Sequence, residues 1–266
     1  MNASSEQVRY IRLNAMKVEI HPSREAMGAA AAAATADALQ ELAQSHETVA
    51  AIFATGASQL DTLDALTSIP GLPWAQICGF HLDEYVGLPL THKASFRGYL
   101  REKLTQKVTM KEFHEIDGTA PDPGEVCASY AVHLRASQPQ LCLLGIGENG
   151  HLAFNDPGVA DFNDPVDVKV VNLDNACRQQ QAAEGWFTSP AEVPNQAISL
   201  TIPTILRVPR LIVSVPGERK ARIVRRALEE AISTECPATI LRTHPGVTLY
   251  LDPDSAAQLA GFIPEL

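Results

Sequence analysis

Short apolar segments alternate along the chain with longer segments of helical spacing. Compact apolar runs occupy residues 49–54, 77–80, 141–144 and 210–215. Such runs, bounded by glycine or polar residues, are typical of strands buried on both faces in a parallel sheet. Helical spacing follows them in residues 61–66, 125–135 and 218–232. The pattern predicts an α/β fold: a doubly wound, mostly parallel sheet with helices on both faces.

The remaining segments fit around this alternation. Ser23 precedes an alanine-rich stretch to about Ala43, which indicates a long capped helix. We expect strands at residues 18–20, 113–116, 168–173, 196–201, 238–241 and 247–251, and helical segments at 92–104, 176–187 and 203–206. Because no linker, repeat or coiled coil interrupts the pattern, residues 1–266 are predicted to form a single domain.

Three of the strands run directly into a glycine-containing turn and then a helix. The first turn comprises Thr55, Gly56, Ala57 and Ser58. Backbone N–H groups at a helix N-terminus favour a phosphate group, although about half of such turns are plain connections, and the Walker A pattern is absent. The third turn precedes a helix that begins with Glu218, Arg219 and Lys220. Cations oppose the helix dipole there, which suggests an anion; a solvated basic face is the alternative.

The second turn carries a group of polar side chains. Residues 145–157 set Glu148, Asn149, His151, Asn155 and Asp156 close together after a buried strand. A histidine with polar partners at the carboxyl end of a strand suits proton transfer near neutral pH. The alternative is a glycine turn with a capping Asn and a surface His.

Adjacent carboxylates, Asp83 and Glu84, follow the strand at residues 77–80. They suggest a functional carboxylate held by its neighbour, with a solvated loop or an N-cap at Asp83 as the alternative. Because the carboxyl ends of parallel strands meet at one edge, we expect Asp83, Glu84, His151, Lys220 and the first turn to line one cleft. The carboxylates, the histidine, the lysine and the phosphate-favouring turn together suit acid–base chemistry on a small phosphorylated molecule.

Composition indicates which binding partners and which cellular compartment to expect. The net charge of −10 argues weakly against nucleic-acid binding, and no segment reads as a membrane span or signal peptide. Five scattered cysteines without a CxxC pair fit reduced thiols in the cytoplasm better than a disulfide framework or zinc cluster. No GxGxxG follows the first strand, so we expect no dinucleotide cofactor. No ligand spacing in the sequence calls for a metal, so we expect none. The sequence leaves the oligomeric state open, a homo-oligomer included.

Two longer motifs resemble those of a known family. FHLDEYVGLP (residues 80–89) and LLGIGENGHLAFNDPG (residues 143–158) resemble the glucosamine-6-phosphate deaminase (isomerase) family, which is related to 6-phosphogluconolactonases. ATGAS, PGERKA and LRTHP support the resemblance, which extends from about residue 18 to residue 252. It implies a doubly wound α/β fold without metal that converts glucosamine 6-phosphate and water into fructose 6-phosphate and ammonia.

The resemblance also implies roles for individual residues. Asp83 matches the carboxylate that moves the proton between C2 and C1, and His151 matches the histidine that opens the sugar ring. Asn149 and Asp156 are then the groups that orient His151. Lys220 and the turn at residues 55–58 match the phosphate site.

This sequence departs from the family pattern at several positions. Asp156 stands where the family usually has Glu, so its reach to His151 is expected to need a backbone shift or a water. Ala57 and Gln59 replace Gly and Pro in the phosphate turn, and Ala57 would resist a positive φ. The family's phosphate-binding lid arginine has no secure match; Arg178 and Arg219 are the candidates. No basic stretch for allosteric control is recognisable around residues 166–170.

Three other functions remain open on the sequence. A related deaminase acting on galactosamine 6-phosphate needs the same residues. A 6-phosphogluconolactonase has the same fold, but the segments after Asp83 and His151 favour the deaminase. A non-catalytic sensor of sugar phosphates is the third, and the retention of Asp83 and His151 speaks against it.

Overall fold

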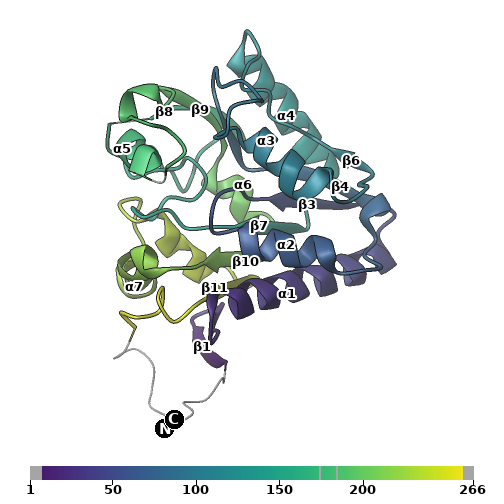
Figure 1. The fold of residues 1–266 in the computed structure, drawn as a ribbon, viewed down its shortest axis with the longest axis vertical. Coiled ribbons are helices and arrows are strands. Elements are labelled where there is room, and N and C mark those ends of the chain that lie inside the picture. Colours follow the sequence, from purple (N-terminus) through teal and green to yellow (C-terminus); the bar gives the residue numbers. More distant parts are fainter. Residues whose placement is uncertain (1–7, 174, 184, 260–266) are drawn as a thin grey trace.

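An eight-stranded sheet forms the centre of the molecule. The computed structural model describes residues 8–173, 175–183 and 185–259. The strands lie in the order β1-β2-β11-β10-β7-β3-β4-β6 (Figure 1). All neighbours are parallel except β1 and β2. The strands are β1 (Arg9–Leu13), β2 (Met16–Ile20), β3 (Val49–Phe53), β4 (Ile77–His81), β6 (Glu112–Phe113), β7 (Leu141–Leu144), β10 (Arg210–Val215) and β11 (Val247–Leu251).

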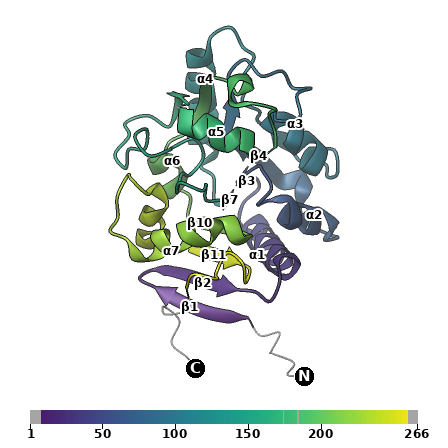
Figure 2. The same cartoon turned by 60° about the vertical axis from the view of Figure 1, so that its left-hand side comes forward.

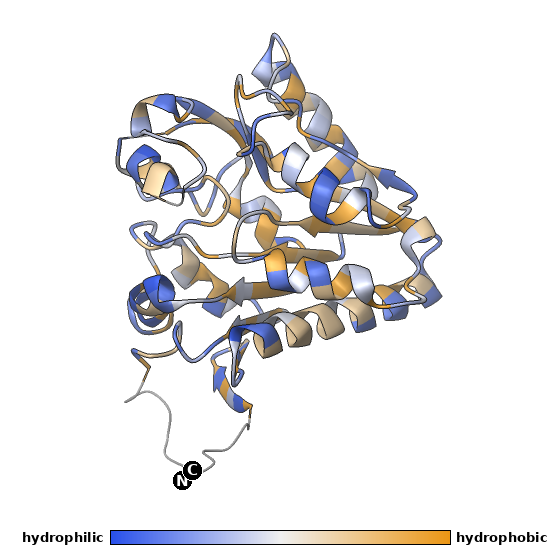
Figure 3. Cartoon of the chain, viewed as in Figure 1, coloured by the Kyte–Doolittle hydropathy of each residue, from blue (hydrophilic) through white to orange (hydrophobic). Residues whose placement is uncertain are grey.

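Helices cover both faces of this sheet, so the predicted doubly wound α/β fold is confirmed. One apolar cluster joins the sheet to α1 (Arg24–Ser45), α2 (Leu60–Ser68) and α3 (Phe96–Leu100). The other joins it to α4 (Pro123–Ser137), α6 (Ile202–Leu206) and α7 (Ala221–Glu229). Hydrophobic residues concentrate in the strands and on the helix faces between these layers (Figure 3). Burial of this apolar surface drives the layers together.

The sheet has a switch point between β3 and β7. From β3 the chain passes through α2 to β4 on one side, whereas from β7 it continues to β10 on the other side. In open α/β sheets, ligands bind in the crevice outside the carboxyl ends of the strands at such a point. The turn at residues 55–58 follows β3 and the loop at residues 145–157 follows β7, so both predicted functional segments meet there.

A second, smaller sheet stands beside the first. It contains β5 (Asp83–Tyr85), β9 (Gln196–Leu200) and β8 (Val168–Asn172), all antiparallel. Asp83 therefore lies in a strand, next to the end of β4. Helix α5 (Asn175–Ala183) follows β8 and packs on the same side of the molecule (Figures 1 and 2).

Several predicted elements differ from the observed ones. Residues 238–241 were expected as a strand but lie in a 3₁₀ helix, Pro237–Thr243, because proline fixes a helical φ at its start. The expected helix at 92–104 begins at Phe96 after the Ser95 cap and continues as a π-helical turn, Arg101–Thr105. The sequence did not predict β1, which pairs with β2 as a hairpin at the sheet edge (Figure 2).

The helix expected at residues 218–232 is also shorter than predicted. A 3₁₀ turn, Glu218–Lys220, comes first and α7 ends at Glu229. Throughout the described residues, no helix combines the length and apolar character needed to cross a bilayer.

Replacing Leu39 with alanine should destabilise the fold. Leu39 is fully buried in α1 against the sheet. Loss of its side chain leaves a cavity, so Leu39→Ala should lower the free energy of unfolding by about 2–5 kcal/mol in urea denaturation. Gln40→Ala, an exposed position in the same helix, is the control and should change it by less than about 0.5 kcal/mol. Equal effects at the two positions would contradict this packing.

Candidate functional site

A pocket of ≈ 410 Å³ opens at the carboxyl ends of the central strands. Its lining includes the turn after β3, Asp83, the loop after β7 and Lys220. The structure thus brings together seven of the predicted site residues: Thr55, Gly56, Ala57, Ser58, Asp83, His151 and Lys220. Asn149 and Asp156 do not line the pocket. The His151 N–H donates to Asn149 Oδ1, and His151 Nδ1 forms a hydrogen bond with Asp156 Oδ1.

The turn after β3 is fixed from several directions. Its positive φ of 90° falls on Gly56, where glycine carries no steric penalty. Ala57 does not have a positive φ, so the expected strain at this residue is absent. Tyr99 donates to the Gly56 carbonyl at 3.0 Å and Arg24 to the Ala57 carbonyl at 2.8 Å. The turn is therefore held in place before any ligand arrives.

Gln59 connects this turn to the neighbouring strand. Its fully buried amide donates to Ser58 Oγ and to the Leu144 carbonyl, both at 3.2 Å. Leu144 ends β7, directly before the loop that carries His151. Gln59, which stands where the resembled family commonly has proline, thus connects the two functional segments.

Cations surround the turn. Lys220 is the N-cap residue of α7 and donates to the Ile146 carbonyl at 2.8 Å. Arg219 lines the pocket and pairs with Glu148 at 2.7 Å. Arg178 instead donates to the carbonyls of Pro190 and Val193 and is not among the lining residues. Of the two candidate arginines, the geometry therefore retains Arg219.

Arg24 also lines the pocket, although the sequence reasoning missed it. It stands in the first turn of α1 and pairs with Asp61 at 2.6 Å. Like Lys220, Arg24 is a cation at the start of a helix, where the helix dipole disfavours it, so the sequence does carry a signal for it.

His151 is held by a direct contact with Asp156. The His151 Nδ1 and Asp156 Oδ1 atoms are 3.0 Å apart, and Asn149 donates to the same oxygen at 2.6 Å. Of the two expected routes, a backbone shift or a bridging water, the structure shows a direct contact that depends on the backbone. A tight turn, in which the Asn155 N–H donates to the Leu152 carbonyl at 3.1 Å and Ala153 has φ 52°, folds Asp156 back onto the ring.

The charge of Asp156 is stabilised in this position. Burial alone would raise its pKa, but His151 and hydrogen bonds from His151, Asn149 and Cys177 lower the pKa of Asp156 to about 2. A carboxylate at Nδ1 fixes the imidazole tautomer and favours its protonated form.

The His151 ring lies so close to Gly147 that a Cβ there would be 2.2 Å from His151 Nε2, so glycine is required at that position.

Asp83 lies in a different electrostatic environment. Burial raises its pKa, and the charges of Glu84 and Asp156 add to this while His151 opposes it, giving a pKa of about 8. The side chain lines the pocket although Asp83 is only 7% exposed. A carboxyl group with a pKa near neutral is able both to accept and to return a proton.

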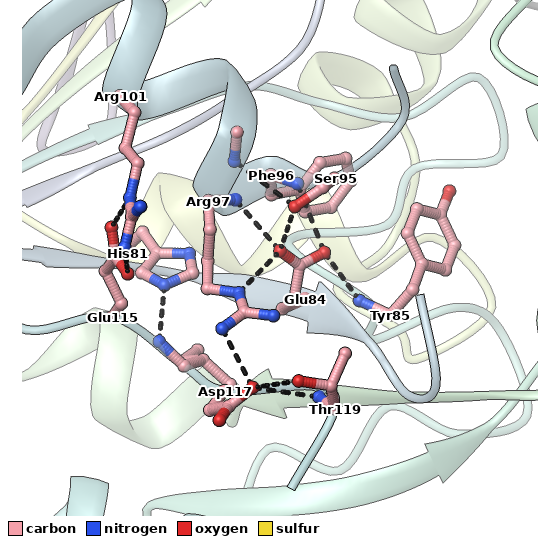
Figure 4. Close-up of polar contacts among 12 residues, drawn as sticks. His81, Glu84, Tyr85, Ser95, Phe96, Arg97, Arg101, Glu115, Asp117 and Thr119 are labelled. Carbon is pink, nitrogen blue, oxygen red and sulfur yellow. Dashed lines mark hydrogen bonds and ion pairs between the residues drawn. The ribbon is translucent and has the colours of Figure 1, made fainter. Parts of the chain in front are cut away.

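Glu84 does not enter the pocket, so the prediction that both carboxylates line the cleft is wrong. Successive side chains of a strand point to opposite faces, and Glu84 points toward α3 (Figure 4). It accepts hydrogen bonds from Ser95 Oγ at 3.0 Å and from the N–H groups of Phe96 at 3.1 Å and Arg97 at 2.8 Å.

Arg97 completes this buried cluster. Its guanidinium lies 3.6 Å from Glu84 and 2.8 Å from Asp117 (Figure 4). The contacts anchor β5 to the N-terminus of α3, so Glu84 supports the strand that presents Asp83.

The helical segment expected at residues 176–187 contributes to the site. Gln181 of α5 and Trp186 line the pocket, and Tyr85 donates to Gln181 Oε1 at 2.7 Å. Cys177 Sγ lies 3.5 Å from Asp156 Oδ2. No spacing in the sequence identified these residues, because their contacts depend on how α5 folds back over the sheet.

Comparisons with known proteins place the chain among relatives. Residues 22–250 match the model of the family described as glucosamine-6-phosphate isomerases/6-phosphogluconolactonase. The chain is 36% identical over 189 residues to a glucosamine-6-phosphate deaminase of Exiguobacterium sp., covering 71% of this chain and 72% of the relative. It is 33% identical over 217 residues to a glucosamine-6-phosphate deaminase of Bacillus cereus, covering 82% and 80%.

Solved structures of two other proteins superpose on the fold of this chain. A monomeric glucosamine-6-phosphate deaminase superposes with a TM-score of 0.82 at 30% identity, covering 91% of this chain and 99% of that one. A 6-phosphogluconolactonase from Trypanosoma brucei superposes with a TM-score of 0.75 at 18% identity, covering 94% and 100%, and shares the fold.

Replacing Asp83 with asparagine should stabilise the protein increasingly as the pH rises. A folded pKa of about 8, above the ordinary value of 3.8, favours the folded state at low pH, and this contribution is lost as pH rises through about 8. The neutral asparagine lacks this ionisation. The melting temperature of Asp83→Asn relative to wild type should therefore rise by several degrees between about pH 7 and about pH 9, measured by calorimetry.

Asp254→Asn is the matched control. It makes the same change at an exposed position outside the pocket, away from Asp83 and His151. Its difference from wild type should stay constant between about pH 7 and about pH 9. A constant difference for Asp83→Asn as well would contradict the environment assigned to Asp83.

Proposed function

Because the chain belongs to the family of glucosamine-6-phosphate isomerases and 6-phosphogluconolactonases, we propose that it converts glucosamine 6-phosphate and water into fructose 6-phosphate and ammonia. Relatives of that activity, 33–36% identical over most of the chain, support the assignment. The observation that carries it is one pocket holding a buried carboxyl of raised pKa, a carboxylate-bound histidine and a phosphate turn.

The phosphate group binds at the turn after β3. The backbone N–H groups of residues 55–58 supply donors, and Lys220 and Arg219 supply positive charge. Arg24, which lines the same pocket, adds a third cation. Anchoring the phosphate places the far end of the sugar near Asp83 and His151, which are the groups suited to proton transfer.

His151 opens the sugar ring. The imidazole takes the proton from the O1 hydroxyl and gives a proton to the ring oxygen, which produces the open-chain aldehyde. Asp156 stabilises the imidazolium that forms during this exchange, and Asn149 holds Asp156 in place.

Asp83 moves the proton that interconverts the aldose and the ketose. It removes the proton from C2 and returns it to C1, while one proton of the C2 ammonium passes to O1. This leaves a protonated imine at C2 and a hydroxyl at C1. Water adds to this imine, and ammonia leaves as the ketone forms. A substrate ammonium at C2 favours the ionised form of Asp83, so an amino sugar prepares the base that acts on it. A lactone has no such group.

The proposal extends to the setting of the enzyme. The reaction needs no cofactor or metal, because proton transfers and the addition of water suffice. Among the described residues, no disulfide joins the cysteines, which suits a reducing compartment such as the cytoplasm.

A product assay tests the assignment. Purified protein is incubated with glucosamine 6-phosphate or galactosamine 6-phosphate, and ammonia and the ketose phosphate are measured. We expect turnover of glucosamine 6-phosphate with the higher kcat/KM. Absence of product from both at every pH between about 6 and about 9 would overturn the proposal, as would hydrolysis of 6-phosphogluconolactone alone.

Asp83→Asn should abolish turnover while leaving binding intact. Loss of a general base costs about 10²–10⁴-fold in kcat. The phosphate contacts remain, so the Kd for fructose 6-phosphate, which lacks the ammonium, should change by less than about threefold. Stopped-flow kinetics and calorimetry measure the two quantities. Asp254→Asn, at an exposed position outside the pocket, is the control. A near wild-type kcat for Asp83→Asn would remove Asp83 from the mechanism.

A further inference from the structure

We propose that Cys78, Glu112 and His114 form a binding site for a zinc ion at the edge of the central sheet. The site is separate from the pocket that holds the sugar phosphate and goes beyond the proposed reaction. It joins β4 to the edge strand β6. Among the described cysteine, histidine and acidic side chains, these three have ligand atoms that lie close enough to one another to hold one ion together.

Strand pairing brings the three side chains together. Cys78 of β4 and Glu112 of β6 are direct neighbours in the parallel register. His114 follows Glu112 by two residues, so its side chain returns to the same face. The next pair along this face confirms the alignment, because the rings of Phe80 and His114 stack with centroids 4.6 Å apart.

The separations suit a tetrahedral ion. The three ligand atoms all lie within 4.8 Å of one another, and His114 Nε2 is 3.5 Å from Glu112 Oε2. Ligands of a tetrahedral zinc ion, at about 2.0–2.3 Å from the metal, are roughly 3.3–3.8 Å apart. Small side-chain rotations therefore suffice, and the Glu112 side chain, 60% exposed, has the freedom to make them.

The donor set favours zinc over magnesium or calcium. A thiol, an imidazole and a carboxylate offer sulfur, nitrogen and oxygen, whereas the harder cations prefer oxygen alone. His114 lies between the rings of Phe80 and His133, which restricts its orientation. Binding converts the Cys78 thiol into a zinc-bound thiolate and releases its proton to solvent. A fourth position is left for water on the exposed side.

A bound ion would stabilise the edge of the sheet. Strand β6 comprises only Glu112–Phe113 and pairs with β4 alone. Edge strands of this length contribute few hydrogen bonds, so an ion that connects β6 to β4 adds a restraint the backbone lacks. The carboxyl end of β4 leads directly to Asp83.

Cobalt and zinc titrations test this site. The full chain is stripped with a chelator and titrated with Co²⁺, whose bond to a thiolate produces a charge-transfer band in the near ultraviolet. We expect one equivalent of Co²⁺ to produce the band, Zn²⁺ to displace it, and Zn²⁺ to raise the melting temperature of the stripped protein by several degrees.

Variants identify the ligands. Cys78→Ser should abolish the band, while Cys127→Ser, a buried cysteine of α4 outside the cluster, should retain it. Because Glu112 is exposed, Glu112→Gln should fold like the wild type. It should weaken Zn²⁺ binding at least about tenfold and leave turnover unchanged. Absence of a band below about 100 μM Co²⁺, or a band and affinity unaffected by Cys78→Ser and Glu112→Gln, would overturn the proposal.

Discussion

Parallel pairing of β3 with β7 is the constraint on which the site depends. The two strands are neighbours in the sheet although their connections lead to opposite sides. Their carboxyl ends therefore face the same crevice, where the turn at residues 55–58 meets the loop that carries His151. Gln59 reinforces the pairing with its hydrogen bond to Leu144. A phosphate anchor and a proton-transfer group are thereby held at a fixed separation by the sheet itself.

The protein stabilises three neighbouring buried carboxyl groups in three different ways. Glu84 accepts four hydrogen bonds from Tyr85, Ser95, Phe96 and Arg97 and serves as a structural anchor. Asp156 is paired with His151, which keeps its pKa low. Asp83 has only the partial compensation of the nearby His151 charge, and burial raises its pKa. Environments that drive the pKa values of nearby groups apart are what acid–base catalysis at neutral pH requires.

Burial of Asp83 lowers the stability of the folded state, whereas contacts of the surrounding loops stabilise it. An uncompensated buried carboxyl group disfavours the folded state once it ionises. The surrounding loops are held by contacts that do not take part in the chemistry, such as those of Tyr99 and Arg24 with the phosphate turn. Their rigidity positions the reactive groups without reorganisation during the reaction.

The sequence alone determined the fold class, the strand–turn–helix junctions and seven residues that line the pocket, because hydrophobic periodicity and glycine turns are local signals. Tertiary structure decided the rest. Strand alternation turned Glu84 away from Asp83, and the fold of residues 152–156 brought the shorter Asp156 directly to His151. Arg24 and Gln181 reach the pocket from distant segments. Contacts of this kind depend on which side chains meet across the sheet, and that is a property of packing that no local pattern encodes.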